Sequence, residues 1–213
     1  MLDATRIAAL LRPFADVSDE LANRLRIYLD LLLRWNARIN ITAIRDPEQI
    51  VTRHFGESLF AARILYDTGA FKAGATPTLS DIGSGAGFPG IPIKLVAPEV
   101  HVTLIESQNK KATFLGEVIR TLNLKGIDVF SGRAETWNHT AQTVTLRAIE
   151  KFEQTLPLAA TLVAPSGTLC LLIGREQVGS AEAVLAPSWH FRKPVATPSS
   201  RERMVLVGIR PQV

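Results

Sequence analysis

The sequence contains one cysteine, Cys170, and has no long apolar run. A single thiol excludes an internal disulfide bond. No apolar stretch reaches the roughly 18 residues that a membrane helix needs. The first residues, MLDATRIAALLRPF, lack the basic and apolar regions of a signal peptide. We therefore expect a cytoplasmic protein with no membrane-spanning segment.

Histidine is also scarce, and no histidine–cysteine cluster has the spacing of metal ligands, so we expect no metal site. The 213 residues are 46% hydrophobic and 21% charged, which predicts one ordinary folded domain with a small appendage. The net charge of +4 mildly favours a polyanionic partner.

Residues 1–70 have a helical pattern. Apolar side chains recur at helical spacing between Leu21 and Trp35, and Ser18 stands where an N-cap is expected. A second helix start has Asp46 at the N-cap, Pro47 at the first helical position and Gln49 two residues later. We predict a helical extension over residues 1–70, packed on a main domain over residues 71–213.

After residue 77 the sequence pattern changes from purely helical to alternating strands and helices. Short β-branched runs at 78–83, 102–106, 127–131, 143–148 and 168–173 alternate with helical stretches at about 89–97, 108–123 and 152–163. This order predicts an α/β fold with a mostly parallel sheet covered on both faces. Residues 189–196 and 204–210 have no helix between them, so we expect an antiparallel pair at one edge.

The stretch LSDIGSGAGFPGIP, residues 79–92, places glycines at every second position behind Asp81. Gly83, Ser84, Gly85 and Gly87 follow a buried strand and lead into a helix. Glycines permit positive φ angles and let a ligand approach the main chain closely. In an open α/β sheet, ligands bind at the carboxyl ends of the strands. The stretch therefore predicts a ligand-binding loop.

Two cofactor classes fit this loop. Gly85, Gly87 and Gly90 match the dinucleotide pattern G-x-G-x-x-G, which would make the protein a nicotinamide-dependent oxidoreductase. The form D-x-G-x-G-x-G that begins at Asp81 resembles the first motif of S-adenosylmethionine-dependent methyltransferases. Glu106, at the end of the next strand, suits the ribose of either cofactor. The terminal antiparallel pair favours S-adenosyl-L-methionine, although a non-catalytic sensor of an adenosine ligand stays open.

Two further missing features limit which atom of the substrate could be methylated. Cys170 lies in an apolar strand and is expected to be an inert core residue, not a nucleophile. The residues after the fourth strand, 146–150, lack the Asn/Asp-Pro-Pro-aromatic motif of amino-group methylation. Guanine N7 needs no general base, which makes it a suitable acceptor. A small-molecule or protein substrate remains the alternative.

Motifs along the whole chain resemble the RsmG family of bacterial 16S rRNA methyltransferases, also called GidB or glucose-inhibited division protein B. The segments that carry the resemblance are Trp35-Asn36, Asn40-Ile41-Thr42, Arg45-Asp46-Pro47, Arg53-His54-Phe55, Glu57-Ser58-Leu59, the stretch from Asp81 to Pro92, Glu106-Ser107, Arg133-Ala134-Glu135, Leu146-Arg147-Ala148 and Glu202-Arg203. The resemblance implies a Rossmann-like class I fold with a seven-stranded sheet whose last strand is antiparallel. It also implies methylation of guanine N7 in the 530 loop of 16S rRNA.

The resemblance further implies roles for individual residues. Gly83 and Phe88 would flank the cofactor, Ala134 and Glu135 would lie by the adenine, and Arg147 would face both the cofactor and the incoming base. The candidates for cofactor binding are Asp81, Gly83, Ser84, Gly85, Gly87, Phe88, Glu106, Ser107, Ala134, Glu135 and Arg147. The catalytic candidates are Arg147, His54, Asn40 and Arg133.

The segment RKPVATPSSRER, residues 192–203, is basic and rich in proline and serine. Its basic residues are Arg192, Lys193, Arg201 and Arg203. A loop of this kind can bind phosphates, so we predict that these four residues contact 16S ribosomal RNA, either naked or in the small ribosomal subunit. We expect the protein to be a monomer.

Overall fold

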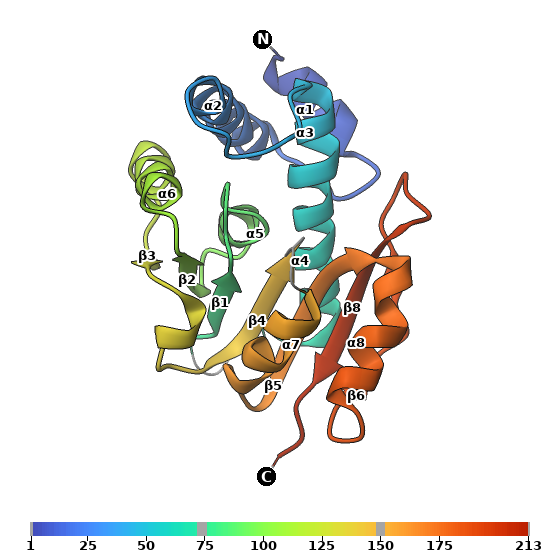
Figure 1. Cartoon of the computed structure of the whole chain (residues 1–213). Coiled ribbons are helices and arrows are strands. Elements are labelled where there is room, and N and C mark those ends of the chain that lie inside the picture. Colours follow the sequence, from blue (N-terminus) through green and yellow to red (C-terminus); the bar gives the residue numbers. More distant parts are fainter. Residues whose placement is uncertain (1, 72–75, 148–151, 213) are drawn as a thin grey trace.

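The computed structural model describes residues 2–71, 76–147 and 152–212 (Figure 1). The helices are α1 (Ala4–Leu11), α2 (Asp19–Asn36), α3 (Pro47–Ile50), α4 (Glu57–Thr68), α5 (Gly90–Val96), α6 (Asn109–Thr121), α7 (Phe152–Thr161) and α8 (Val178–Leu185), with a π-helix, η1, over Val51–Gly56. The strands are β1 (Thr78–Ile82), β2 (His101–Glu106), β3 (Ile127–Ser131), β4 (Ala141–Arg147), β5 (Val163–Gly174), β6 (His190–Phe191), β7 (Val195–Ala196) and β8 (Arg203–Ile209).

The strands form one sheet in the order β3-β2-β1-β4-β5-β8-β6, and β7 also pairs with β8. Strands β1 to β5 are parallel, and β8 is antiparallel to β5. The predicted class I methyltransferase fold is confirmed. The prediction of one continuous strand over 189–196 was wrong, because Pro194 cannot donate a ladder hydrogen bond and the edge strand is divided into β6 and β7.

The predicted helix starts are confirmed in the N-terminal region. The Ser18 hydroxyl accepts a hydrogen bond from the Leu21 N–H at 3.2 Å, and Asp46 accepts one from the Gln49 N–H at 2.8 Å. The helix that begins at Pro47 is not uniform, because six residues between α3 and α4 adopt the π form. Helix α8 was not predicted, because its sequence VGSAEAVL has a weak helical pattern.

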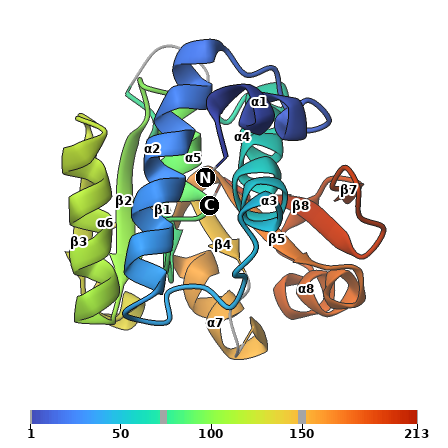
Figure 2. The ribbon, with the colours of Figure 1, turned by 90° about the horizontal axis from the view of Figure 1, so that it is seen from above.

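Helices cover both faces of the sheet (Figure 1). Helices α4, α5 and α6 lie on one face with α1 and α2 packed outside them, and Figure 2 shows α2 running beside α6. Helices α7 and α8 cover the other face. No helix among the described residues is both long and apolar enough to span a bilayer.

One hydrophobic core runs from the N-terminal helices into the sheet. It joins Leu25 and Tyr28 of α2 and Phe55 of η1 to Leu104 of β2 and Cys170 of β5. Cys170 is fully buried, as predicted, and burial raises the pKa of its thiol to about 12. The division of the chain at residue 70 stays a prediction, and residues 72–75 beside it lie outside the described part of the chain.

Candidate functional site

The loop after β1 has the backbone that its glycines predict. Gly83, Gly85 and Gly87 have φ angles of 65°, 56° and 89°, in the region that residues with a Cβ rarely adopt. A side chain at Gly87 would also overlap the Tyr28 hydroxyl and the Ile91 side chain. The backbone conformation therefore favours glycine at all three positions, and the available space requires it at Gly87.

The side chains of Asp81 and Ser84 fix the conformation of the loop through hydrogen bonds. Buried Asp81 accepts hydrogen bonds from the Thr145 hydroxyl at 2.7 Å and from the Gly90 N–H at 3.2 Å. The Ser84 hydroxyl donates to the Asp81 main-chain carbonyl at 2.8 Å. Burial raises the pKa of the Asp81 carboxyl to about 6, although its hydrogen bonds act in the opposite direction. Both side chains hold the loop between β1 and α5.

A cavity of about 540 Å³ lies beside the loop, at the carboxyl ends of β1, β2 and β3. Glu106 lines it, and the carboxylate accepts hydrogen bonds from the Gly85 N–H at 2.9 Å and the Gln108 N–H at 2.8 Å. These bonds fix the carboxylate at the end of β2 and join it to the glycine loop. The arrangement suits a ligand that offers hydroxyl donors to Glu106 and approaches the main chain of Gly83 and Gly85.

The other side of this cavity comes from the segment after β3 and from α7. Arg133, Ala134 and Glu135 line it, together with Ser107, which follows β2. Their roles in binding and catalysis stay predictions. Arg133 and Glu135 form an exposed ion pair with an N–O distance of 3.0 Å at its rim. The sequence analysis missed several further lining residues, because the pattern carries no signal for them; these are Gln108, Lys111, Thr155 and Leu158.

Phe88 packs into an aromatic cluster on the core side of the loop. Its ring stacks on Tyr28 at a centroid distance of 5.5 Å and on His54 at 4.8 Å, and it meets Phe55 edge-on at 5.3 Å. The Tyr28 hydroxyl donates to the Ala86 carbonyl within the loop. Phe88, which the resemblance places beside the cofactor, thus joins the glycine loop to α2 and η1.

His54 lies in η1 and is buried. One ring nitrogen, Nε2, is 2.8 Å from the Thr42 hydroxyl, and the other, Nδ1, has no partner among the described residues. Burial, followed by the positive charges of Arg147, Arg53 and Arg203, lowers the pKa of His54 to about 2. The imidazole is therefore neutral at physiological pH.

Arg147 is a buried cation at the carboxyl end of β4. Its guanidinium donates to the Glu57 carboxylate at 3.0 Å and to the Arg53 carbonyl at 2.7 Å. The Nε of this guanidinium has no partner in the described part of the chain. Arg147 thus ties β4 to η1 and α4, next to His54. Ala148, which completes the Leu146-Arg147-Ala148 motif, lies outside the described residues.

Asn40 is exposed, accepts a hydrogen bond from Arg45 at 2.8 Å and is not among the residues that line the cavity. The buried amide in this connector is Asn36, whose side chain bonds the main chain of Ile41 and Thr42. Of the four basic residues predicted to bind RNA, Arg192, Lys193 and Arg201 are exposed and Arg203 is partly buried. Within the described ranges, no group of three or more metal-ligating side chains gathers.

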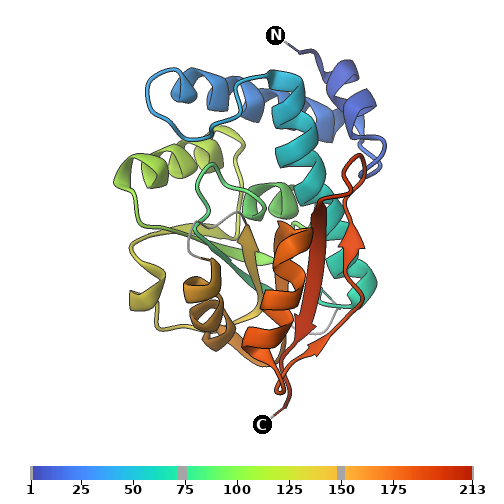
Figure 3. The same cartoon turned by 45° about the vertical axis from the view of Figure 1, so that its right-hand side comes forward.

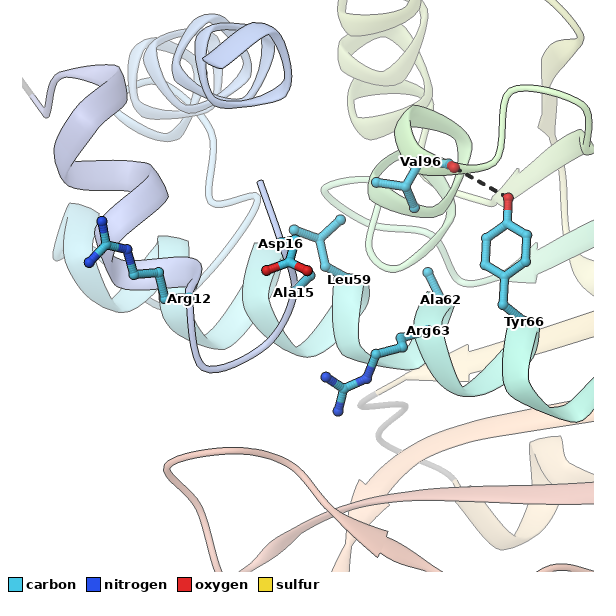
Figure 4. A pocket seen from close by; sticks show the side chains of 8 residues that line it. All are labelled: Arg12, Ala15, Asp16, Leu59, Ala62, Arg63, Tyr66 and Val96. Atoms are coloured by element: carbon cyan, nitrogen blue, oxygen red, sulfur yellow. Dashed lines mark hydrogen bonds between the residues drawn. The ribbon is translucent and has the colours of Figure 1, made fainter. Parts of the chain in front are cut away.

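Another cavity, of about 270 Å³, lies between α4, α5 and the segment after α1 (Figure 4). Leu59, Ala62 and Tyr66 of α4 form one wall, and the Tyr66 hydroxyl donates to the Val96 carbonyl at 3.3 Å. Neither a glycine loop nor the carboxyl end of a strand contributes to it. The cavity at Gly83 and Glu106 is therefore the candidate cofactor site.

Comparisons with known proteins identify relatives along most of the chain. The chain is 36% identical over 86% of its length to ribosomal RNA small subunit methyltransferase G of Xylella fastidiosa strain 9a5c, and it covers 84% of that protein. It is 43% identical over 68% of its length to the protein of the same name from Roseiflexus castenholzii, of which it covers 58%.

Two solved structures show the fold. Magnesium protoporphyrin IX methyltransferase from Synechocystis, with bound S-adenosylmethionine, matches 88% of this chain and 97% of its own at a TM-score of 0.65 and 13% identity. Precorrin-6y C5,15-methyltransferase from Geobacter metallireducens matches 72% of this chain and 88% of its own, at a TM-score of 0.55 and 11% identity. The family model described as rRNA small subunit methyltransferase G matches residues 21–192, and the chain belongs to this family, GidB.

Proposed function

We propose that this protein transfers the methyl group of S-adenosyl-L-methionine to N7 of a guanine in the 530 loop of 16S ribosomal RNA. The observation that carries this proposal is the cavity formed by the glycine loop and Glu106 in a member of the rRNA small subunit methyltransferase G family. The position of the guanine and its N7 atom rest on the resemblance described above.

The cavity has the groups that an adenosine cofactor needs. Glu106 is held where its carboxylate accepts hydrogen bonds from ribose hydroxyls, and Gly83 and Gly85 leave the main chain open to the methionine end. Ala134 and Glu135 would contact the adenine. When bound, S-adenosylmethionine supplies a methyl group on a sulfonium, which a nucleophile with a free lone pair can attack.

Guanine N7 has such a lone pair and needs no general base. The protein then contributes alignment and exclusion of water, which supply up to roughly 7–11 kcal/mol of a barrier. His54, whose pKa is lowered to about 2, is a weak base, and methylation of N7 requires no base because no proton has to be removed from the acceptor. This supports N7 over an exocyclic amine as the acceptor.

Two buried nitrogens near the carboxyl end of β4 have no hydrogen-bond partner among the described residues. We place Arg147 Nε as a single donor to guanine O6, and His54 Nδ1 beside the base, because neither atom has a partner among the described residues. A single donor to O6 leaves N7 free, whereas an arginine bonded to both O6 and N7 would block the reaction. We do not carry Asn40 and Arg133 into this step, because Asn40 bonds Arg45 and Arg133 pairs with Glu135 at the rim.

The RNA itself would be bound by the basic segment before β8. Arg192, Lys193 and Arg201 are exposed and free to meet phosphates, with Arg203 deeper in the structure. We propose that the protein acts as a monomer in the cytoplasm, on naked 16S rRNA or on the small ribosomal subunit.

Methyl transfer can be tested with labelled S-adenosylmethionine and either naked 16S rRNA or 30S subunits that lack the modification. The expected result is label in one N7-methylguanine, mapped by alkaline cleavage of the RNA. Glu106→Ala is the loss-of-function control, and it is expected to bind the cofactor roughly 10- to 100-fold more weakly than the wild type. Label in a protein or metabolite would refute the proposal, and cofactor binding without any transfer would identify a sensor.

A further inference from the structure

A separate cavity of about 330 Å³ lies between η1, the segment after α1 and the loop before β8. Figures 1 and 3 both show the loop before β8 next to the segment that follows α1. Phe14 forms an apolar wall, Thr52 and Arg53 come from η1, and Ser199, Ser200 and Arg203 come from the loop and the start of β8. Three segments distant in sequence therefore build this site.

Positive charge converges on this cavity. Arg53 and Arg203 line it, and Arg147 lies behind it through its bond to the Arg53 carbonyl. Glu57 is paired with Arg147, while neither the Arg53 nor the Arg203 guanidinium bonds or ion-pairs with another described side chain. Glu202 is the one other acid in the lining among the described residues. Two guanidinium groups thus remain to pair with an anion.

The loop also presents a hydroxyl donor. Ser200 Oγ accepts hydrogen bonds from the N–H groups of Glu202 at 3.3 Å and of Arg203 at 3.1 Å. These bonds use its oxygen and leave the hydroxyl hydrogen to donate. A hydroxyl and two arginines that line one cavity form a set of donors that matches the oxygens of a phosphate.

The cavity lies at the carboxyl ends of the parallel strands, as the candidate cofactor site does. Arg203 is opposite Gly174, at the carboxyl end of β5, and the glycine loop follows the carboxyl end of β1. Arg53 precedes His54, whose ring stacks on Phe88 of that loop. By contrast, the Arg192 N–H bonds the Val207 carbonyl, four residues along β8 from Arg203, which is about 14 Å in an extended strand.

We propose that this cavity binds one phosphate of the RNA backbone next to the methylated guanosine, through Arg53, Arg203 and the Ser200 hydroxyl. The proposal rests on the proposed function, since it concerns the same RNA. Arg53 and Arg203 then hold the RNA backbone at the carboxyl ends of the strands, where the base meets the cofactor. The exposed residues Arg192 and Lys193 bind the RNA farther along the sheet.

The test uses Arg53→Gln, Arg203→Gln and the double variant, assayed for kcat/KM on 30S subunits or 16S rRNA over a range of salt concentrations. Each single variant is expected to lose roughly 10- to 100-fold in kcat/KM but to change the slope of log(kcat/KM) against log salt little, because the other arginine still neutralises the phosphate. The double variant leaves that phosphate without a cation and should reduce the slope by about 0.7–0.9. Arg53→Lys, which keeps the charge, should keep the slope.

Arg120→Gln is the matched control, because it removes one exposed charge from the last turn of α6, the helix that leads into the edge strand β3. Cofactor affinity, measured by calorimetry without RNA, should be the same in all variants. Loss of cofactor binding would show a structural role and overturn the proposal, as would rates equal to those of Arg120→Gln or additive changes in slope. A wild-type protein that methylates no RNA would instead refute the proposed function.

Discussion

At the scale of single residues, buried Asp81 connects the cofactor loop to the sheet and titrates in an unusual range. Its two acceptor bonds, from Thr145 and Gly90, fix the turn from β1 into α5. Full burial opposes the charged form and raises the pKa of the carboxyl from 3.8 to about 6. The residue that shapes the loop therefore makes the stability of the protein depend on pH.

We predict that the free energy of unfolding contributed by Asp81 falls as the pH rises from about 4 to 6. Between these values the folded protein binds a proton at Asp81 more tightly than the unfolded chain does, so raising the pH favours unfolding. The full effect is on the order of 2–3 kcal/mol. Urea unfolding of the wild type and Asp81→Asn at pH 4 and pH 7 measures it. The stability difference between the two proteins should change by this amount, and parallel pH curves would contradict the prediction.

At the scale of elements, the ion pair of Arg147 and Glu57 joins β4 to the first turn of α4. Both side chains are buried, with 9% and 6% of their surface exposed. Removing one partner from a buried pair leaves the other charge uncompensated, which typically costs about 3–5 kcal/mol. The contact is therefore sensitive to a single substitution and less sensitive to a paired one.

We expect Arg147→Met to lower the free energy of unfolding by about 3–5 kcal/mol. The double variant Arg147→Met with Glu57→Gln should be more stable than the single variant by at least about 1 kcal/mol, because no isolated charge remains. Urea unfolding at pH 7 without ligand measures both. A double variant no more stable than the single one would show that the pair does not couple the two elements.

A feature of this structure could be predicted from the sequence when a few neighbouring residues determine it. The glycine loop, the Ser18 and Asp46 caps and Glu106 are each set by a few neighbouring residues, and all were predictable. The π-helix was not, because the spacing of Ile50, Val51 and Phe55 fits an ordinary helix equally well. The approach of Arg53, Arg147 and Arg203 depends on three distant segments and has no signal in the linear pattern.

At the scale of the whole molecule, the N-terminal helices complete the cofactor loop. Tyr28 of α2 is fully buried, donates a hydrogen bond to the Ala86 carbonyl and stacks on Phe88. The same core includes residues of β2 and β5. The N-terminal helices and the sheet thus share one interior, and a change at Tyr28 of α2 directly affects the loop that lines the candidate cofactor site.

We predict that Tyr28→Phe loses about 1–3 kcal/mol of stability, because the Ala86 carbonyl remains buried without its donor. Affinity for S-adenosylmethionine should fall several-fold while kcat changes little, since the hydroxyl positions the loop and does not meet the reacting atoms. Tyr66→Phe removes the hydroxyl of an exposed tyrosine that bonds Glu99 and is the matched control. Calorimetry and steady-state kinetics measure the effect, and equal affinities for the two variants would contradict it.

The π-helix has a consequence for insertions and deletions. It holds one more residue per turn than an α-helix would, so deleting a single residue from Val51–Gly56 would let the segment rewind as an α-helix. Each residue of an α-helix turns the chain by about 100°. Because the deleted residue is the one that widens the turn, the rewound segment makes about the same number of turns and leaves α3 and α4 in nearly the same orientation. The side chains within the segment would rotate about the helix axis instead, so Arg53 would leave its cavity and His54 its place against Phe88. A deletion here would therefore disturb the site more than the fold.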